Sequence, residues 1–334
     1  VVPSQPDLEV VGAFNAGAVQ VGDEFVLLVR IAERPLEREA DFVQAPYWDL
    51  EQGSIRIRQF RRSDPDLELG DERVFRHRGC FYLTSVSHLR VARSLDGRRF
   101  SIDEQPSLAP ADRLECYGIE DPRITEIDGE FLITYKAVSR HGVTTALART
   151  SDFARYEWHG TIFCPENLDV VIFPEKIDGQ YAAWTRPVGV HQGAPAIWLA
   201  KSDDLLHWGG HRPVMAPRPE RWDSARIGAG CVPFRFGDHW VEIYHGADAS
   251  HRYCAGVALI DADDPARIVA RSAQPILEPE MDYELEGFFG GVVFPCGHVL
   301  GRDGHLLVYY GAADETVCAV EMDAAAICHR AGLR

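Results

Sequence analysis

Two adjacent carboxylates in residues 118–124, which read Gly-Ile-Glu-Asp-Pro-Arg-Ile, are the first candidates for chemistry in this chain. Pro122 fixes its own φ and restrains Asp121 to an extended backbone. Because neighbours in an extended segment point to opposite sides, one of Glu120 and Asp121 can face a pocket while the other braces the scaffold against Arg123. An acid that faces a substrate pocket can donate a proton. The residues alone are also compatible with a structural carboxylate–arginine network at a turn.

The surrounding sequence predicts short strands and tight turns rather than helices. Apolar runs rich in Val, Ile, Phe, Tyr and Trp follow turn dipeptides, which is typical of β-hairpins. Six dipeptides of this kind occur: Gly22-Asp23, Arg78-Gly79, Asp128-Gly129, Asp178-Gly179, Gly237-Asp238 and Asp303-Gly304. Residues 323–333 are rich in Ala and are compatible with a short helix or a returning strand.

A second motif follows several of these hairpins and recurs at a nearly constant spacing. It places a basic residue before Ser or Thr and then Asp, around Arg93, Arg149 and Lys201, 56 and then 52 residues apart. A repeat of this size built from short strands is typical of a β-propeller blade. At about 50 to 60 residues per blade the chain holds five or six blades, with an open β-sandwich as the alternative. No linker divides the sequence, so residues 1–334 are expected to form a single catalytic domain.

The composition excludes several partners. The chain has 334 residues, with 34 Lys and Arg against 51 Asp and Glu, which gives a formal net charge of −17 at pH 7. This balance argues against binding nucleic acid or an anionic membrane surface, since both need clustered positive charge. No apolar run approaches a membrane span, and residues 1–7 do not resemble a signal peptide. A local arginine cluster can still bind a small anion within an acidic protein.

The cysteines and the remaining motifs point to a cytoplasmic protein without a metal. Eight cysteines are scattered and include no Cys-x-x-Cys pair, so free and mostly buried thiols are expected. The histidines lack the spacing of a zinc site. No phosphate-binding glycine loop and no serine nucleophile elbow are present.

Residues 118–125 resemble the hallmark motif of glycoside hydrolase family 130, the β-mannoside phosphorylases and related mannosidases. The resemblance extends over nearly the whole chain and includes residues 15–18, 27–30, 83–90, 92–94, 165–167, 171–179, 185–187, 227–230, 243–246, 293–297 and 309–314. The region of His88 and the run Phe173-Pro174-Glu175-Lys176 are most similar to the branch that acts on β-1,2-linked mannosides. The resemblance implies an all-β, five-bladed β-propeller.

The resemblance also implies a role for individual residues. Asp121 is expected to be the sole catalytic acid, which protonates the leaving sugar directly or through a mannose hydroxyl. Inorganic phosphate is the expected nucleophile and co-substrate, with no other cofactor, and it needs cations rather than a protein base. The implied phosphate ligands are Arg186, Arg226 and His245. The implied sugar ligands are Asn15, Arg30, Arg93, Glu120 and Asp314, while Lys176 and Tyr244 are expected to support the site or to be structural.

Three departures from the family pattern keep other functions open. Leu168 stands where the β-1,2 phosphorylases tend to have a basic residue, Arg226 stands where they tend to have Lys, and Cys231-Val232 replaces Pro-Pro. Loss of a phosphate contact would favour a mannosidase that uses water, with Asp282, Glu284 or Glu286 as candidate bases. A non-catalytic glycan-binding propeller is the second alternative. The expected partners are an oligosaccharide and phosphate, and a homo-oligomer remains open.

Overall fold

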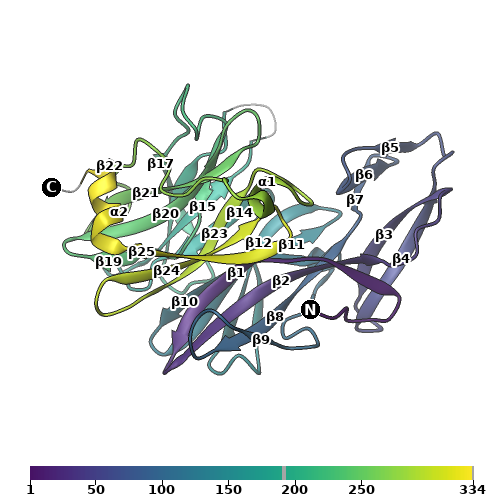
Figure 1. Ribbon diagram of the computed structural model, residues 1–334, viewed down its shortest axis with the longest axis horizontal. Helices are drawn as coiled ribbons and strands as arrows, with labels where there is room; N and C mark the ends of the chain where they lie inside the picture. The colour runs from purple at the N-terminus through teal and green to yellow at the C-terminus, as the bar shows by residue number, and fades with distance from the viewer. Residues whose placement is uncertain (190–192, 333–334) are drawn as a thin grey trace.

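The computed structural model describes residues 1–189 and 193–332, and it is built almost entirely of antiparallel strands (Figure 1). The all-β prediction is therefore confirmed. The helices are the 3-10 turn η1 (Arg113–Glu115), the short α1 (Asp282–Leu285) and α2 (Ala324–Ala331), so the helical alternative for the C-terminal segment is correct. No helix among the described residues is long and apolar enough to cross a membrane. All eight cysteines are free, but only Cys231, Cys254, Cys296 and Cys328 are buried.

Most strands form successive antiparallel meanders. The second meander is β10 (Ile119–Ile127), β11 (Glu130–Ser139), β12 (Gly142–Thr150) and β13 (Glu157–Phe163), and the third is β14 (Asn167–Ile172), β15 (Tyr181–Pro187), β16 (Ile197–Ser202) and β17 (Gly209–Met215). The fourth contains β18 (Arg226–Ala229), β19 (Phe234–Phe236), β20 (His239–Ala247), β21 (Tyr253–Asp261) and β22 (Ile268–Arg271).

The two ends of the chain meet in one seven-stranded sheet. Its N-terminal part is β1 (Leu8–Val21), β2 (Glu24–Pro35), β8 (Val86–Ser94) and β9 (Ser101–Ile102), and its C-terminal part is β23 (Val293–Leu300), β24 (His305–Ala312) and β25 (Thr316–Asp323). A parallel pairing of Ala13 with Thr316 joins the two parts. The order of contacts is cyclic, because β1 contacts β10, β10 contacts β14, β14 contacts β18, β20 contacts β23, and β23 contacts β1.

Apolar clusters fill the space between the faces of consecutive meanders. One combines Val26 and Leu28 of β2 with Ile124 of β10 and Ile133 of β11. The backbones also approach closely here, because a Cβ atom on Gly17 of β1 would lie 2.9 Å from the carbonyl oxygen of Pro122 in β10. This packing fixes the first strands of neighbouring meanders against one another, and those strands carry the site described below.

The same irregularity interrupts the first strand of three consecutive meanders. In β1, β10 and β14 one extra residue is inserted opposite the second strand, at Asn15, Asp121 and Asp169. All three residues have a positive φ, between 49° and 52°, which Asn and Asp tolerate better than other residues that carry a Cβ. The prediction that Asp121 is extended is therefore wrong. The bulge breaks the strict alternation of side chains, so that Glu120 and Asp121 face the same cavity.

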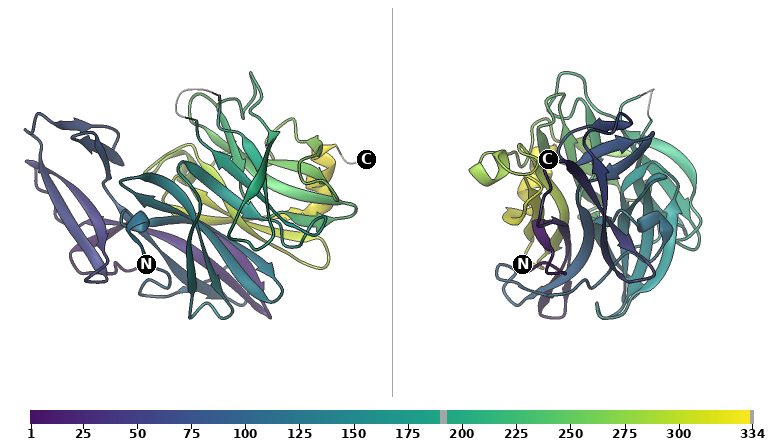
Figure 2. Two further views of the ribbon diagram at one scale, coloured as in Figure 1. Left: turned by 180° about the vertical axis from the view of Figure 1, so that it is seen from behind. Right: turned by 90° about the vertical axis from the view of Figure 1, so that its right-hand side faces the viewer.

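Residues 36–85 leave the first meander between β2 and β8 and form two small sheets. These are β3 (Phe42–Asp49) with β4 (Ser54–Arg61), and β5 (Leu67–Leu69) with β6 (Val74–His77) and β7 (Cys80–Leu83). They project to one side of the molecule, at the end opposite α2 (Figures 1 and 2). The hairpin at Arg78-Gly79 thus belongs to this projecting arm and not to the repeated meanders.

Candidate active site

A cavity of about 320 Å³ lies where the bulges of β1 and β10 meet the arm and the C-terminal strands. Five residues expected to bind the sugar or to act on it line this cavity: Asn15, Arg30, Glu120, Asp121 and Asp314. Residues far apart in the sequence are thereby brought together.

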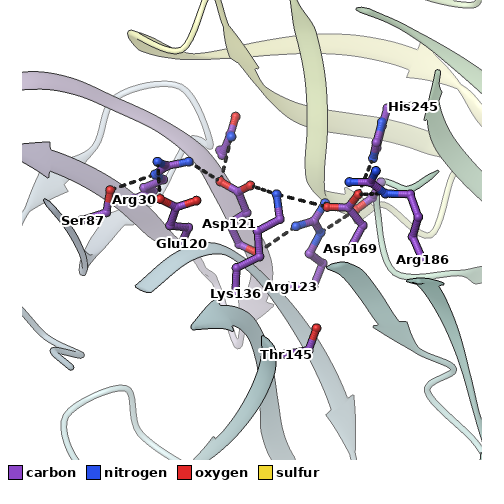
Figure 3. Close-up of polar contacts among 12 residues, drawn as sticks. Arg30, Ser87, Glu120, Asp121, Arg123, Lys136, Thr145, Asp169, Arg186 and His245 are labelled. Atoms are coloured by element: carbon purple, nitrogen blue, oxygen red, sulfur yellow. Dashed lines mark hydrogen bonds and ion pairs between the residues drawn. The ribbon is translucent and has the colours of Figure 1, made fainter. Parts of the chain in front are cut away.

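Asp121 is buried and is held by three donors (Figure 3). Its Oδ1 accepts hydrogen bonds from Asn15 Nδ2 at 2.8 Å and from Arg30 Nη1 at 3.0 Å, and its Oδ2 pairs with Lys136 Nζ at 2.5 Å. Arg30 also donates to Glu120 Oε1 at 2.7 Å and to Ser87 Oγ at 3.0 Å. The two carboxylates of the motif are therefore clamped by one guanidinium group.

These partners decide the protonation of Asp121. Burial alone would raise its pKa, but the charges of Lys136, Arg30 and Arg123 outweigh burial and hold the pKa well below its usual range. Asp121 is therefore ionised at neutral pH in this arrangement. It can serve as a proton donor once bound ligands raise its pKa, which an anion placed beside Lys136 would do.

Asp169 links this acid to the residues expected to bind phosphate, and its role was not predicted. Its Oδ2 accepts from Arg186 Nε at 2.7 Å and contacts His245 Nε2 at 3.1 Å, while its Oδ1 lies 3.3 Å from Lys136 Nζ. The positive φ of the β14 bulge directs Asp169 toward all three. Gly228 is required beside them, because a Cβ there would lie 2.5 Å from His245 Nε2 and 2.6 Å from Asp169 Oδ2.

His245 is not a cation, which corrects the expectation from the sequence. It is completely buried, and burial lowers its pKa to about 4 although Asp169 opposes this change. The imidazole is therefore neutral at neutral pH, and its single N–H, on Nε2, is directed at the carboxylate of Asp169. Its ring packs 4.3 Å from the ring of Phe294, which lines the cavity.

The three expected phosphate ligands are not all held in one cluster. Arg186 and His245 share Asp169, whereas Arg226 donates to Tyr253 Oη at 3.1 Å and contacts His251 Nδ1 at 3.1 Å. Tyr253 lines the cavity and its ring lies 5.9 Å from the ring of His245. Arg186, Arg226 and His245 are thus not among the residues that line the cavity, but each is joined to one that is. Arg226 contacts Tyr253, His245 packs on Phe294, and Arg186 is joined to Lys136 through Asp169.

The pKa of Asp314 is shifted in the opposite direction to that of Asp121. Burial raises its pKa to about 6, with the negative charges of Asp121 and Glu120 adding to burial and Arg30 and Arg73 opposing it. Its φ is also positive, at 56°. A carboxyl group of this kind is half protonated near pH 6. In its protonated form it can donate a hydrogen bond to a sugar hydroxyl, and in either form it can accept one.

Aromatic rings also line the cavity, and several of them pack against its charged residues. Phe14, Tyr253, Phe288, Phe289 and Phe294 line it, and Arg30 lies over the ring of Phe14 at 4.6 Å. Arg73 of the arm lies over the ring of Phe289 at 4.1 Å. Such rings offer flat apolar surfaces to the carbon faces of a sugar.

Several candidates lie elsewhere. Arg93, expected to bind the sugar, is at the far end of β8, where it pairs with Glu24 at 3.4 Å and donates to the carbonyl of Asp152. Arg149 in the next meander pairs in the same way with Glu130 at 3.7 Å. Arg93 and Arg149 therefore make the same kind of ion pair at equivalent positions of two meanders, and Arg93 does not line the cavity.

The remaining candidates have structural contacts. Tyr244 donates to buried Asp223, and Lys176 lies over the ring of Tyr181. Glu284, one of the candidate bases, accepts from the backbone of Met281 and from Tyr310 Oη. Neither Glu284 nor its exposed neighbours Asp282 and Glu286 line the cavity.

Comparison with known proteins places these residues in a family. The family model described as beta-1,4-mannooligosaccharide phosphorylase, that of glycoside hydrolase family 130, matches residues 71–329. The beta-1,2-mannobiose phosphorylase of Listeria innocua serovar 6a is 42% identical over 99% of this chain and 94% of its own length. The 1,2-beta-oligomannan phosphorylase of Thermoanaerobacter sp. (strain X514) is 38% identical over 70% of this chain and 77% of its own length.

A solved structure agrees with these sequence matches. The structure of beta-1,2-mannobiose phosphorylase from Listeria innocua in complex with beta-1,2-mannobiose superposes with a TM-score of 0.95, covering 100% of this chain and 96% of that one. The family match spans well over half of the sequence, and the first relative is similar over its full length. The chain therefore belongs to glycoside hydrolase family 130.

Proposed function

We propose that this protein cleaves β-1,2-linked mannosides, mannobiose or oligomannan, with inorganic phosphate, and that the reaction inverts the anomeric centre to give α-D-mannose 1-phosphate and a shortened acceptor. The observation that carries the proposal is the continuous chain of contacts from Asp121 through Lys136 and Asp169 to Arg186 and His245. It joins a candidate acid to anion-binding groups beside one cavity. The relatives reported above, named for the same linkage, support the choice of substrate.

In the proposed reaction a phosphate oxygen attacks the anomeric carbon from the face opposite the leaving sugar. The bond from that carbon to the bridging oxygen breaks, and the bridging oxygen takes the proton of Asp121, directly or through a mannose hydroxyl. Inversion follows because one displacement occurs on one face of the ring. Phosphate is already an anion, so this step needs no protein base.

The charges around the cavity fit this pair of substrates. Arg186 and Arg226 supply positive charge, and the imidazole of His245 helps to hold Asp169, which orients Arg186. Asn15, Arg30, Glu120 and Asp314 offer donors and acceptors to the hydroxyls of a neutral sugar, beside the aromatic rings of the cavity. No cofactor other than inorganic phosphate as co-substrate is proposed.

We also propose that the meanders form a five-bladed β-propeller with the site at one end of its axis. The cyclic contacts among the meanders, and the parallel pairing of Ala13 with Thr316, support this arrangement. Six of the cavity residues come from β1, β2 and β10, as expected where blades converge: Phe14, Asn15, Arg30, Ala32, Glu120 and Asp121.

The decisive experiment measures turnover of β-1,2-mannobiose with and without phosphate, with β-1,4-mannobiose as the matched substrate. We expect turnover that requires phosphate, α-mannose 1-phosphate as the product by ³¹P NMR, and a preference for the β-1,2 linkage. Release of free mannose at the same rate without phosphate would establish a mannosidase instead. Binding of mannobiose without any turnover would establish a glycan-binding protein.

A further inference from the structure

We propose that Lys136 is a phosphate-binding residue of this site, an inference that rests on the proposed function. It was not among the candidates from the sequence. It is one of only three lysines in the chain, with Lys176 and Lys201, and the one that lines the cavity.

The ammonium group of Lys136 retains an N–H donor that is available to the cavity. An ammonium group has three N–H donors. One donates to Asp121 Oδ2 at 2.5 Å, and the ammonium group also forms an ion pair with Asp169 Oδ1 at 3.3 Å. The side chain is 13% exposed, so a remaining donor can reach a ligand. Burial would lower the pKa of Lys136, but Asp121 and Asp169 raise it above its usual value, so the group remains charged.

The nearby arginines are placed differently. Arg123 is 1% exposed, and it donates to the carbonyl oxygens of Asp121, Ala229 and Gly230. Arg30 directs three of its five N–H groups at Glu120, Asp121 and Ser87. Of the cations that the structure places around Asp121, Lys136 is therefore the one that is partly exposed and also contacts Asp169, the carboxylate that holds Arg186.

The repeat of the fold supports the same assignment. In each bulged meander a basic residue of the second strand stands opposite the residue that precedes the bulge: Arg30 opposite Phe14, Lys136 opposite Glu120, and Arg186 opposite Leu168. Lys136 is thus the equivalent, one meander away, of both Arg30 and Arg186. All three contact a carboxylate at a bulge, and Lys136 contacts the bulge carboxylates of two meanders.

The position of β14 places Lys136 beside the region of Arg186. Lys136 pairs with Thr145 of β12, whose hydroxyl donates to the carbonyl of Asn167 at 3.0 Å. Leu168 follows, and it stands opposite Arg186 in the sheet. An ammonium group from β11 therefore supplies charge next to a position where β14 itself presents an apolar side chain.

A phosphate on Lys136 would also affect the acid. The dianion would lie close to the Asp121 carboxyl group and would offset the positive charge that keeps Asp121 ionised. Phosphate binding and protonation of Asp121 would then favour each other. Lys136 would join the two requirements of the reaction, a bound nucleophile and a protonated acid.

The test measures phosphate binding by calorimetry and the KM values for phosphate and β-1,2-mannobiose, at constant ionic strength. We expect K136M to weaken phosphate binding and raise the phosphate KM by about 10-fold or more, because a charge-assisted hydrogen bond is lost. The mannobiose KM should change by less than about threefold. K136R should keep phosphate binding within about threefold. K201M, the same change on a strand outside the cavity, is the matched control.

The strictest test moves the positive charge from β11 to β14. The double variant K136M/L168K places an ammonium group beside the same cluster from β14 and should recover much of the lost phosphate affinity. If K136M does not fold, K136Q replaces it, since its amide can still donate to both carboxylates.

The alternative outcomes are distinct. Unchanged phosphate affinity in K136M or K136Q, with only turnover reduced, would show that Lys136 serves Asp121 alone and would overturn the inference. Phosphate binding is measured without turnover. A wild-type protein that binds phosphate but does not phosphorolyse mannobiose therefore refutes the proposed function, and the comparison of phosphate binding between the wild type and K136M still decides this inference. A wild-type protein that binds no phosphate refutes both.

Discussion

Replacement of Asp314 by Asn should stabilise the protein at alkaline pH and not at acidic pH. Folding raises the pKa of Asp314 from 3.8 to about 6, mainly through burial. At about 1.4 kcal/mol per pH unit, ionised Asp314 costs the folded state about 3 kcal/mol above pH 6. Below pH 3.8 the group is protonated in both states and costs nothing. The free energy of unfolding therefore falls as the pH rises from 3.8 to about 6. An Asn side chain does not titrate, so the variant does not lose this stability.

The backbone favours this substitution as a clean test. Asp314 has a φ of 56°, a conformation that Asn adopts at least as readily as Asp. With an unfolding entropy of about 2 cal/mol/K per residue, 3 kcal/mol corresponds to an increase in Tm of about 4 °C for a chain of this length. The control is Asp178→Asn, at a hairpin turn with a φ of 52° and an exposed side chain, where a change within about 0.5 kcal/mol is expected.

Urea unfolding of D314N and the wild type at pH 8, 6 and 4 gives the required differences in free energy. The gain should be largest at pH 8 and should vanish near pH 4. A variant that is equally stable or less stable at pH 8, or a gain that does not depend on pH, would refute the assignment of a raised pKa. Turnover should fall in the same variant, because a destabilising buried carboxyl group in a cavity is retained for its function.

Three further predictions concern the reaction. Asp121→Asn should lower kcat by about 10²- to 10⁴-fold while mannobiose binding persists, and an aryl β-mannoside with a good leaving group, which needs no proton, should recover much of the rate. Arg186→Met should raise the phosphate KM by more than about 10-fold with little change in the mannobiose KM, since it removes the guanidinium group beside Asp169. Arg93→Met should leave both KM values within about twofold, and a large loss of mannobiose affinity would show that Arg93 does reach the substrate.

The fold was predictable where local turn chemistry determines it. Asp128-Gly129 and Asp178-Gly179 both have positive φ at both residues, as a type I′ turn requires. The first joins β10 to β11, and the bridge between Ile177 and Gln180 closes the second. The repeated turn after the third strand is also present, with the hydroxyls of Ser94, Thr150 and Ser202 accepting from backbone N–H groups. Local signals do not say which sheet a hairpin joins, and so the arm was not anticipated.

The site was predictable only in part, because bulges are not visible as a pattern of apolar residues. Asp121 and the sugar ligands around it were found through the family motif, whereas Asp169 and Lys136 were missed. A signal for both was present, since each is a charged residue inside an apolar strand. The repeat also indicates that Arg93 lies away from the site. Arg149 and Lys201 occupy the same place in the motif, and neither of them lines the cavity.

The acidic composition and the anion site are reconciled by the way the cations are held. Arg30, Arg123, Lys136 and Arg186 carry four positive charges, and the carboxylates between them, Glu120, Asp121 and Asp169, carry three negative charges. Asp121 contacts two of these cations and Asp169 contacts three, and without the two carboxylates the cations would repel one another and lose their geometry. A dianion that enters this network competes with carboxylates for the same cations, so its affinity depends on donors that remain unused. An N–H of Lys136 that makes no hydrogen bond to a carboxylate is such a donor, and through it we propose that the site binds phosphate in a protein of net charge −17.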